Sequence, residues 1–186
     1  MRTKERLRNI PILVKILDEL NKLMRMITDL DKDEFYMRLA LEEAKKAAEE
    51  GEVPVGAILA KGNRVLAKDH NRCIKLNDPT AHAEILVLRK AGKALRNYRL
   101  IDTVMYVTVE PCPMCASAMV HGRISRLVYG TREPKFGAVE SRFHFFQRDG
   151  LNHKVEVKKG VLEKECVGLL KDFFKERRIK AKDDQG

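Results

Sequence analysis

The sequence predicts an α/β protein, a three-layer α/β/α sandwich built around a central mixed sheet of five strands. Helical and strand patterns alternate along the chain from about residue 31, and the first two strand patterns are joined by a short turn, "KGN". Alternating helices cover both faces of such a sheet, and an initial hairpin adds an antiparallel pair to it.

Two helical patterns precede the first strand. Residues 1–30 have apolar residues at three- and four-residue spacing, which predicts an amphipathic N-terminal extension. Met24 and Met26 are alternative start residues, in which case the part before them is an artefact of the assigned start. The segment "DKDEFYMRLALEEAKKAAEEGE" predicts a separate helix that is capped by Asp31 or Asp33 and ended by Gly51.

Five short patterns predict the strands: "VPVGAILA", "RVLAKDH", "TVMYVTV", "RLVYG" and "HKVEVKKG". The segment "NRCIKLNDP" is expected to be a loop, followed by a helix that Thr80 caps and that runs to about Leu95. "PCPMCASAMVHG" predicts a helix entered through proline, and a closing helix is expected from about Leu162 to Arg178. We therefore expect a main domain over residues 31–180 and a disordered polar tail over 181–186.

The net charge of +10 is unevenly distributed. Residues 34–85 carry 8 basic and 9 acidic residues, whereas residues 86–150 carry 11 and 5. This excess favours a polyanionic partner such as nucleic acid, and a solubilising surface is the alternative. Four cysteines do not make a disulfide framework, and no apolar run is long enough for a membrane span. We expect a soluble, cytoplasmic protein that has no membrane association and no secretory signal.

Cys112 and Cys115 form a Cys-x-x-Cys pair at the start of a predicted helix. The spacing is typical of a metal-binding knuckle, and a redox pair or a closed structural zinc site are the alternatives. A closed structural site usually needs four protein ligands, commonly a second cysteine pair, and the sequence offers no such pair.

His82 and Glu84, in "TAHAEI", lie 30 residues upstream in the first turn of another predicted helix. If the two helix starts converge, His82, Cys112 and Cys115 supply one nitrogen and two sulfur ligands, and a fourth position is left for water, as in a catalytic zinc site. Glu84 is then placed to carry protons without being a ligand. A histidine at a helix start is more often simply packed or solvated, so the interpretation depends on the joint pattern.

The pattern His-x-Glu followed by Pro-Cys-x-x-Cys is the signature of the zinc deaminases. From about Asp33 to Arg178 the chain resembles the tRNA adenosine deaminases (TadA type) of the cytidine deaminase superfamily. The resemblance rests on "EVPVGAIL", "DPTAHAEI", "NYRLIDTVMYVTVEPCPMCASAMVHGRI", "LNHKVEV" and "DFFKERR".

This resemblance implies a cytidine deaminase-like fold, a homodimer and the hydrolytic conversion of adenosine to inosine at the wobble position of a tRNA anticodon. It implies Zn2+ on His82, Cys112 and Cys115, with Glu84 as the catalytic proton carrier. It also implies that Asn71 hydrogen-bonds the flipped base. Contacts with the anticodon stem-loop are implied for Asn152, Phe173, Phe174, Lys175, Arg177 and Arg178.

The loop "TREPKFGAVESRFHFFQRDG" departs from the family pattern, because Glu133 stands where familiar members have aspartate and "RFHFF" replaces an aliphatic run. Phe143, Phe145 and Phe146 are expected either at a subunit interface or stacked on a nucleotide. Two other functions stay open: a free-base or nucleotide deaminase of the guanine or cytosine type, and a non-enzymatic RNA-binding protein with a structural zinc. The basic excess argues against the first, and the presence of Glu84 argues against the second.

Overall fold

The computed structural model describes residues 10–183 of the chain. The chain divides into two compact units, residues 1–34 and residues 35–186. The described part of the first unit, residues 10–34, is helical and belongs to helix α2, which spans Ile10–Glu49. No helix within residues 10–183 is long and apolar enough to cross a membrane.

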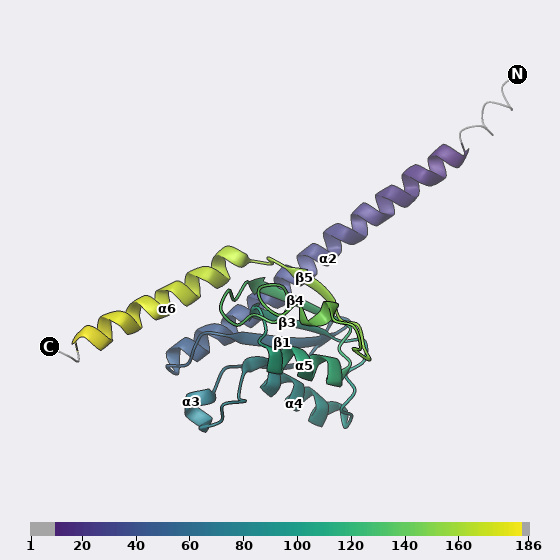
Figure 1. Cartoon of the computed structure of the whole chain (residues 1–186). Coiled ribbons are helices and arrows are strands. Elements are labelled where there is room, and N and C mark those ends of the chain that lie inside the picture. The colour runs from purple at the N-terminus through teal and green to yellow at the C-terminus, as the bar shows by residue number, and fades with distance from the viewer. Residues whose placement is uncertain (1–9, 184–186) are drawn as a thin grey trace, which may run out of the picture. The chain divides into compact units, whose positions relative to one another are not determined.

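The second unit is built on one five-stranded sheet in the order β2-β1-β3-β4-β5 (Figure 1). The strands are β1 Gly56–Lys61, β2 Arg64–His70, β3 Val104–Val109, β4 Arg126–Thr131 and β5 Glu156–Lys159. β1 is antiparallel to both β2 and β3, whereas β3, β4 and β5 are parallel. The sheet is therefore mixed, as the sequence predicted.

Helices cover both faces of this sheet (Figure 1). On one face, α4 (Ala83–Leu95) and α5 (Pro113–Gly122) pack on the alternate strand residues that include Leu59, Val107 and Leu127. On the other face, residues 36–41 of α2 and the helix α6 (Glu163–Asp183) pack on the intervening residues, which include Ile58, Tyr106 and Val128. The period of two along each strand thus separates two apolar cores, and the three-layer prediction is confirmed.

Gly56 allows α2 to pack directly on the start of β1. A Cβ atom at this position would lie 2.1 Å from the carbonyl oxygen of Ala40 and 2.4 Å from the nitrogen of Ala44. Both atoms are helix backbone and cannot move aside as a side chain would, so only glycine fits between this helix and the strand.

Four element boundaries differ from the sequence predictions. α2 has no break at Asp31 or Asp33, because residues 12–49 contain neither glycine nor proline and the helical pattern continues through both aspartates. The predicted loop after β2 contains a short helix, α3, over Cys73–Leu76. The predicted cap at Thr80 is wrong, since α4 begins after His82.

The fourth difference is at the C-terminal helix. α6 ends at Asp183, five residues beyond the predicted Arg178, so residues 181–183 of the predicted disordered tail are helical. The remainder of that predicted tail, residues 184–186, and the first nine residues of the predicted N-terminal extension lie outside the described residues.

Candidate active site

The start of α4 holds two of the predicted site residues. His82 is the N-cap residue, with extended backbone angles (φ −70°, ψ 150°), and its imidazole makes no capping hydrogen bond. Thr80 does not cap the helix because its N–H and its hydroxyl both donate to Oδ1 of Asp78, at 2.7 and 2.6 Å. The imidazole of His82 faces the two cysteines at the start of α5.

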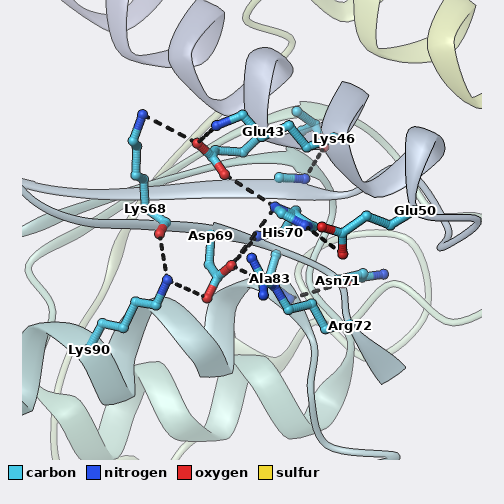
Figure 2. Close-up of polar contacts among 12 residues, drawn as sticks. Glu43, Lys46, Glu50, Lys68, Asp69, His70, Asn71, Arg72, Ala83 and Lys90 are labelled. Atoms are coloured by element: carbon cyan, nitrogen blue, oxygen red, sulfur yellow. Dashed lines mark hydrogen bonds and ion pairs between the residues drawn. The ribbon is translucent and has the colours of Figure 1, made fainter. Parts of the chain in front are cut away.

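Asn71 supplies the cap that His82 does not. It follows the last residue of β2, and its Oδ1 accepts the N–H of Ala83 at 2.9 Å (Figure 2). Its own N–H donates to the carbonyl oxygen of Val55 at 3.0 Å. Asn71 is 9% exposed and lies directly beside the helix start that carries His82.

The start of α5 holds the two cysteines. Cys112 is the N-cap residue (φ −75°, ψ 170°), Pro113 is the first helical residue, and Cys115 lies in the first turn and is fully buried. Proline is favoured at this position because its fixed φ suits the helix and its missing N–H has no helical partner to lose. Cys112, the residue before this proline, has an extended backbone, and its sulfur lies close to that of Cys115.

His82, Cys112 and Cys115 form a cluster whose ligand atoms all lie within 4.8 Å of one another. Nδ1 of His82 is 3.6 Å from the sulfur of each cysteine. A tetrahedral zinc with Zn–N of about 2.0–2.1 Å and Zn–S of about 2.3 Å would separate nitrogen and sulfur by about 3.6 Å. One imidazole and two thiols at these distances therefore fit a zinc ion.

Hydrogen bonding shifts the pKa values of the two cysteines in this cluster in opposite directions. The pKa of Cys112 is lowered to about 4, chiefly because the Cys115 thiol donates to its sulfur; burial opposes this, and a hydrogen bond from His82 adds to it. The pKa of Cys115 is raised because its thiol is the donor of that hydrogen bond and because it is buried. The metal-free pair thus favours one thiolate beside one thiol, and a zinc ion would favour two thiolates.

Glu84 lies in the first turn of α4 and is 3% exposed. Burial raises the pKa of this carboxyl, while a hydrogen bond from its own backbone N–H and the nearby His82 act in the opposite direction. The structure therefore gathers His82, Glu84, Cys112, Cys115 and Asn71 at the starts of α4 and α5.

The predicted RNA contacts lie on other elements. Asn152 is exposed in the loop before β5, where its carbonyl oxygen accepts a hydrogen bond from Arg123. On α6, Phe173 is buried and Phe174 is 42% exposed, so one of the two phenylalanines belongs to the core, as helical spacing predicted. Lys175 and Arg178 are exposed.

Arg177 makes contacts within the protein itself. Its guanidinium donates to the carbonyl oxygen of Gly51 at 3.0 Å and lies 5.2 Å from the ring centre of Phe173. These contacts join α6 to the turn after α2. The basic residues of the tail in the sequence did not predict this structural role of Arg177.

A buried ionic cluster beside Asn71 was not anticipated (Figure 2). His70 is 2% exposed, with Nδ1 3.2 Å from Glu43 of α2 and Nε2 3.3 Å from Glu50 in the turn after it. Asp69 pairs with Lys90 of α4 at 2.8 Å and with Arg72 at 3.2 Å, and its Oδ1 lies 3.8 Å from Nδ1 of His70.

Glu43, Asp69 and His70 lie close enough together to hold a metal ion, but cations already neutralise them. Lys46 and Lys68 lie 2.7 and 3.3 Å from Glu43. We therefore interpret this cluster as structural. The alternation of side chains along β2 is visible in the sequence, but the helices that meet each face are not.

Glu110, directly after β3, is a second residue that the sequence did not single out. It is 3% exposed, and its carboxylate accepts the N–H groups of Glu133, Val139, Glu140 and Ser141 at 2.8–3.0 Å and the hydroxyl of Ser141. Burial alone would raise the pKa of Glu110, but these donors lower it below its ordinary value. The carboxylate holds the loop after β4 against the turn that leads to Cys112.

A His-Cys-Cys cluster and a buried glutamate on an α/β/α sandwich define a deaminase of the cytidine deaminase class. The family described as MafB19-like deaminase matches residues 31–178. The chain is 50% identical over 151 residues to the tRNA-specific adenosine deaminase of Haemophilus influenzae, which covers 81% of this chain and 87% of that protein. It is 46% identical over 153 residues to the enzyme of the same name from Bacillus subtilis, covering 82% and 95%.

Solved structures agree with these relatives. One, described in a study of A-to-I editing by tRNA deaminases at the wobble position of transfer RNA, superposes with a TM-score of 0.72 at 48% identity, covering 73% of this chain and 99% of that one. The chain therefore belongs to the tRNA-specific adenosine deaminases within the MafB19-like deaminase family.

Proposed function

We propose that the protein is a zinc-dependent hydrolase that deaminates adenosine to inosine at the wobble position of a tRNA anticodon. The observation that carries this is the cluster of His82, Cys112 and Cys115 with Glu84 in the adjacent helix turn. The names of the relatives in Haemophilus influenzae and Bacillus subtilis support the choice of substrate. We also propose a cytoplasmic location.

The reaction adds water to carbon 6 of adenine and releases ammonia. His82, Cys112 and Cys115 would hold zinc, which supplies Lewis acidity that lowers the pKa of a water molecule toward neutrality. Glu84 accepts a proton as the new C–O bond forms and delivers a proton to the leaving nitrogen when the C–N bond breaks. The amide nitrogen of Asn71 is the group that donates to the base, since its oxygen is held by Ala83.

The RNA backbone is proposed to contact Asn152 and the exposed face of α6, with Phe174, Lys175 and Arg178. Phe173, which the family pattern also assigns to this surface, is buried, whereas Arg177 is exposed and is proposed to contact the RNA backbone in addition to Gly51. An anticodon loop suits this arrangement, because its unpaired bases are extruded at low cost.

We also propose a homodimer. An open groove of about 770 Å³ lies between α4 and α5, and Ile85, Leu88 and Ala118 are among the residues that line it. Its apolar lining suits a second copy of the chain. Sedimentation analysis tests this: a monomer across the micromolar range would contradict it.

The experiment for the activity is mass analysis of RNA stem-loops, tRNA, free nucleosides and free bases after incubation with zinc-loaded protein. We expect inosine in an anticodon stem-loop with adenosine at the wobble position and little conversion of free adenosine. Glu84→Gln is the inactive control. Faster turnover of guanine or of a cytosine compound than of any RNA would favour the free-base or nucleotide deaminase instead.

The tail is tested by the salt dependence of stem-loop binding. Each phosphate neutralised contributes a log–log slope of about −0.7 to −0.9. We expect Arg178→Ala to flatten the slope by about one such contact, with zinc content unchanged. Arg64→Ala is the matched control, because Arg64 is exposed at the opposite end of β2 from the site. Equal slopes for the two variants would make the tail a solvated helix end.

A further inference from the structure

The loop between β4 and the 3-10 helix η1 (Phe145–Gln147) presents an aromatic pair at the surface. Phe136 is 58% exposed, and its ring meets that of Phe143 edge to face, with centroids 5.8 Å apart. Phe145 and Phe146 differ from this pair, since they pack against the core under α4 and α5. A single exposed phenylalanine is common on protein surfaces and does not by itself indicate a binding site.

Glu110 fixes the backbone that carries Phe136. The five hydrogen bonds that its carboxylate accepts come from Glu133, Val139, Glu140 and Ser141, on both sides of the phenylalanine. A Cβ atom on the neighbouring Gly137 would lie 2.5 Å from the carboxylate, so the loop lies directly on this buried group. Phe136 is therefore displayed by an anchored backbone, which lowers the entropy lost when it contacts a ligand.

The same anchor places the loop beside the candidate active site. Glu110 and Pro111 directly precede Cys112, and the N–H of Ala138 donates to the carbonyl oxygen of Pro111 at 2.8 Å. β3 and β4 are parallel, so the segments that follow them leave from the same end of the strands. The cysteines at the start of α5 and the aromatic loop therefore both lie at the carboxyl ends of these strands, where such sheets bind their ligands.

The charges around Phe136 suit a polyanion. Lys135 is the preceding residue and is exposed, and Arg142, also exposed, is held against the loop by a hydrogen bond from its Nε to the carbonyl oxygen of Pro134 at 2.9 Å. The acidic Glu140 is engaged by Lys159 at 2.6 Å and by Arg132 at 3.8 Å. An aromatic ring flanked by basic side chains is the arrangement that binds unpaired nucleotides.

We propose that Phe136, supported by Phe143, stacks on an unpaired base of the substrate RNA next to the nucleotide that enters the metal site. The inference rests on the proposed function and adds a specificity residue to it. The ring offers one face to the base, and Lys135 and Arg142 lie beside the flanking phosphates. A stem-loop uses this surface, whereas a free nucleoside does not reach it.

Fluorescence provides a direct test, because the chain contains no tryptophan. Phe136→Trp places a single tryptophan at this position, and Phe35→Trp is the matched control at an equally exposed phenylalanine on α2 (57%). Both are made in the Glu84→Gln background so that RNA binds without turnover. We expect saturable quenching of the tryptophan at 136 by the stem-loop and no saturable change at 35.

Kinetics provide the second test. Phe136→Ala is expected to raise KM for the stem-loop by about 5- to 150-fold, with unchanged zinc content and little change in kcat. Phe136→Trp retains stacking and should keep a KM near that of the parent, while Phe35→Ala should behave as the parent.

Three outcomes overturn the inference. One is parental KM in Phe136→Ala together with no quenching in Phe136→Trp. Another is a large rise in KM for Phe136→Trp equal to that of Phe136→Ala. The last is a dimer that dissociates in Phe136→Ala while RNA affinity stays parental, which assigns the face to a second copy of the chain. If the parent itself converts no stem-loop, the proposed function fails, and that result is distinct from all three.

Discussion

Oδ1 of Asn71 accepts the backbone N–H of Ala83 at 2.9 Å, so a side chain at the end of β2 caps the helix that carries His82 and Glu84. His82, the N-cap residue of α4, makes no capping hydrogen bond with its own side chain, so Asn71 caps the helix from another element. This hydrogen bond also fixes the amide of Asn71, with its oxygen toward the helix and its nitrogen left for other contacts.

Two substitutions of Asn71 separate its two tasks. Asn71→Asp keeps an oxygen acceptor for Ala83, and a carboxylate is favourable at a helix N-terminus, but it removes the amide donor. We expect Asn71→Asp to unfold near the parental midpoint and Asn71→Ala to lose about 0.5–2 kcal/mol of stability. Both should raise KM for the stem-loop. Parental kinetics in Asn71→Asp would show that the amide nitrogen takes no part in binding the base.

Glu84→Gln should bind zinc as the parent does and yet turn over about 10²–10⁴-fold more slowly, because an amide cannot carry the proton. Single-turnover rates and metal content measured on the same preparation check this. A loss of less than tenfold with full zinc occupancy would remove Glu84 from the role of proton carrier.

Metal removal should expose two particular thiols. In zinc-loaded protein we expect Cys112 and Cys115 to resist alkylation, since both sulfurs face His82, and to become modified after chelation. Cys73 and Cys166 are distant in sequence and serve as internal references whose modification should not depend on zinc. Peptide mass mapping measures all four sites. Protection that is unchanged after complete chelation would contradict the assignment of these ligands.

The buried ionic cluster should give the protein an acid-sensitive component of stability. Burial alone would raise the pKa of Glu43, but hydrogen bonds from Lys46, His70 and Lys68 bring it down to about 2. A carboxylate whose pKa is lowered by folding stabilises the folded state above its unfolded pKa of about 4.3, and that contribution is lost as the pH falls toward 2.

Urea unfolding against pH tests this component. Glu43→Gln should be less stable than the parent at pH 7, by about 1–3 kcal/mol after allowance for partial solvent screening, and the difference should vanish between about pH 4 and 2. Glu42→Gln, at the exposed neighbouring position, should show no such convergence. A pH-independent difference for Glu43→Gln would mean that packing and not charge is responsible.

The sequence predicted the sheet because strand patterns follow local rules, and it predicted the ligand cluster because its residues match the zinc deaminase signature. Strand patterns of period two, Gly51 after a helix and proline before Cys115 each specify backbone conformation within a few residues. The cap on α4 could not be predicted in this way. Thr80 has the right residue type, yet it bonds to Asp78, and the true partner of Ala83 is 12 residues away on another element.

The acceptor role of Glu110 could not be predicted for the same reason. Its donors lie 23–31 residues downstream in a loop without periodicity, so no local pattern pairs them with a carboxylate after β3. The continuous helix through Asp31 is the reverse case: aspartate favours caps, but the uninterrupted run of helix-forming residues around it continues the helix.

Glu110→Gln should release the loop after β4 while sparing the zinc. Glutamine offers one acceptor oxygen, and its amide nitrogen is a donor. With the nitrogen in the place of Oε2, the N–H of Glu133 loses its acceptor, while the hydroxyl of Ser141 can turn to accept; with the nitrogen in the place of Oε1, three N–H groups lose theirs. Each unsatisfied buried donor costs about 1–3 kcal/mol, and the loop is expected to open rather than keep them buried. Hydrogen exchange should therefore speed up at the amides of residues 133–141, and KM for the stem-loop should rise more than kcat falls.

Glu156→Gln is the matched control, because Glu156 is exposed on β5 and pairs with Arg126 at 3.6 Å. Unchanged exchange in residues 133–141 would mean that the loop holds its conformation without the carboxylate, and rapid loss of zinc would show instead that Glu110 supports the metal site itself.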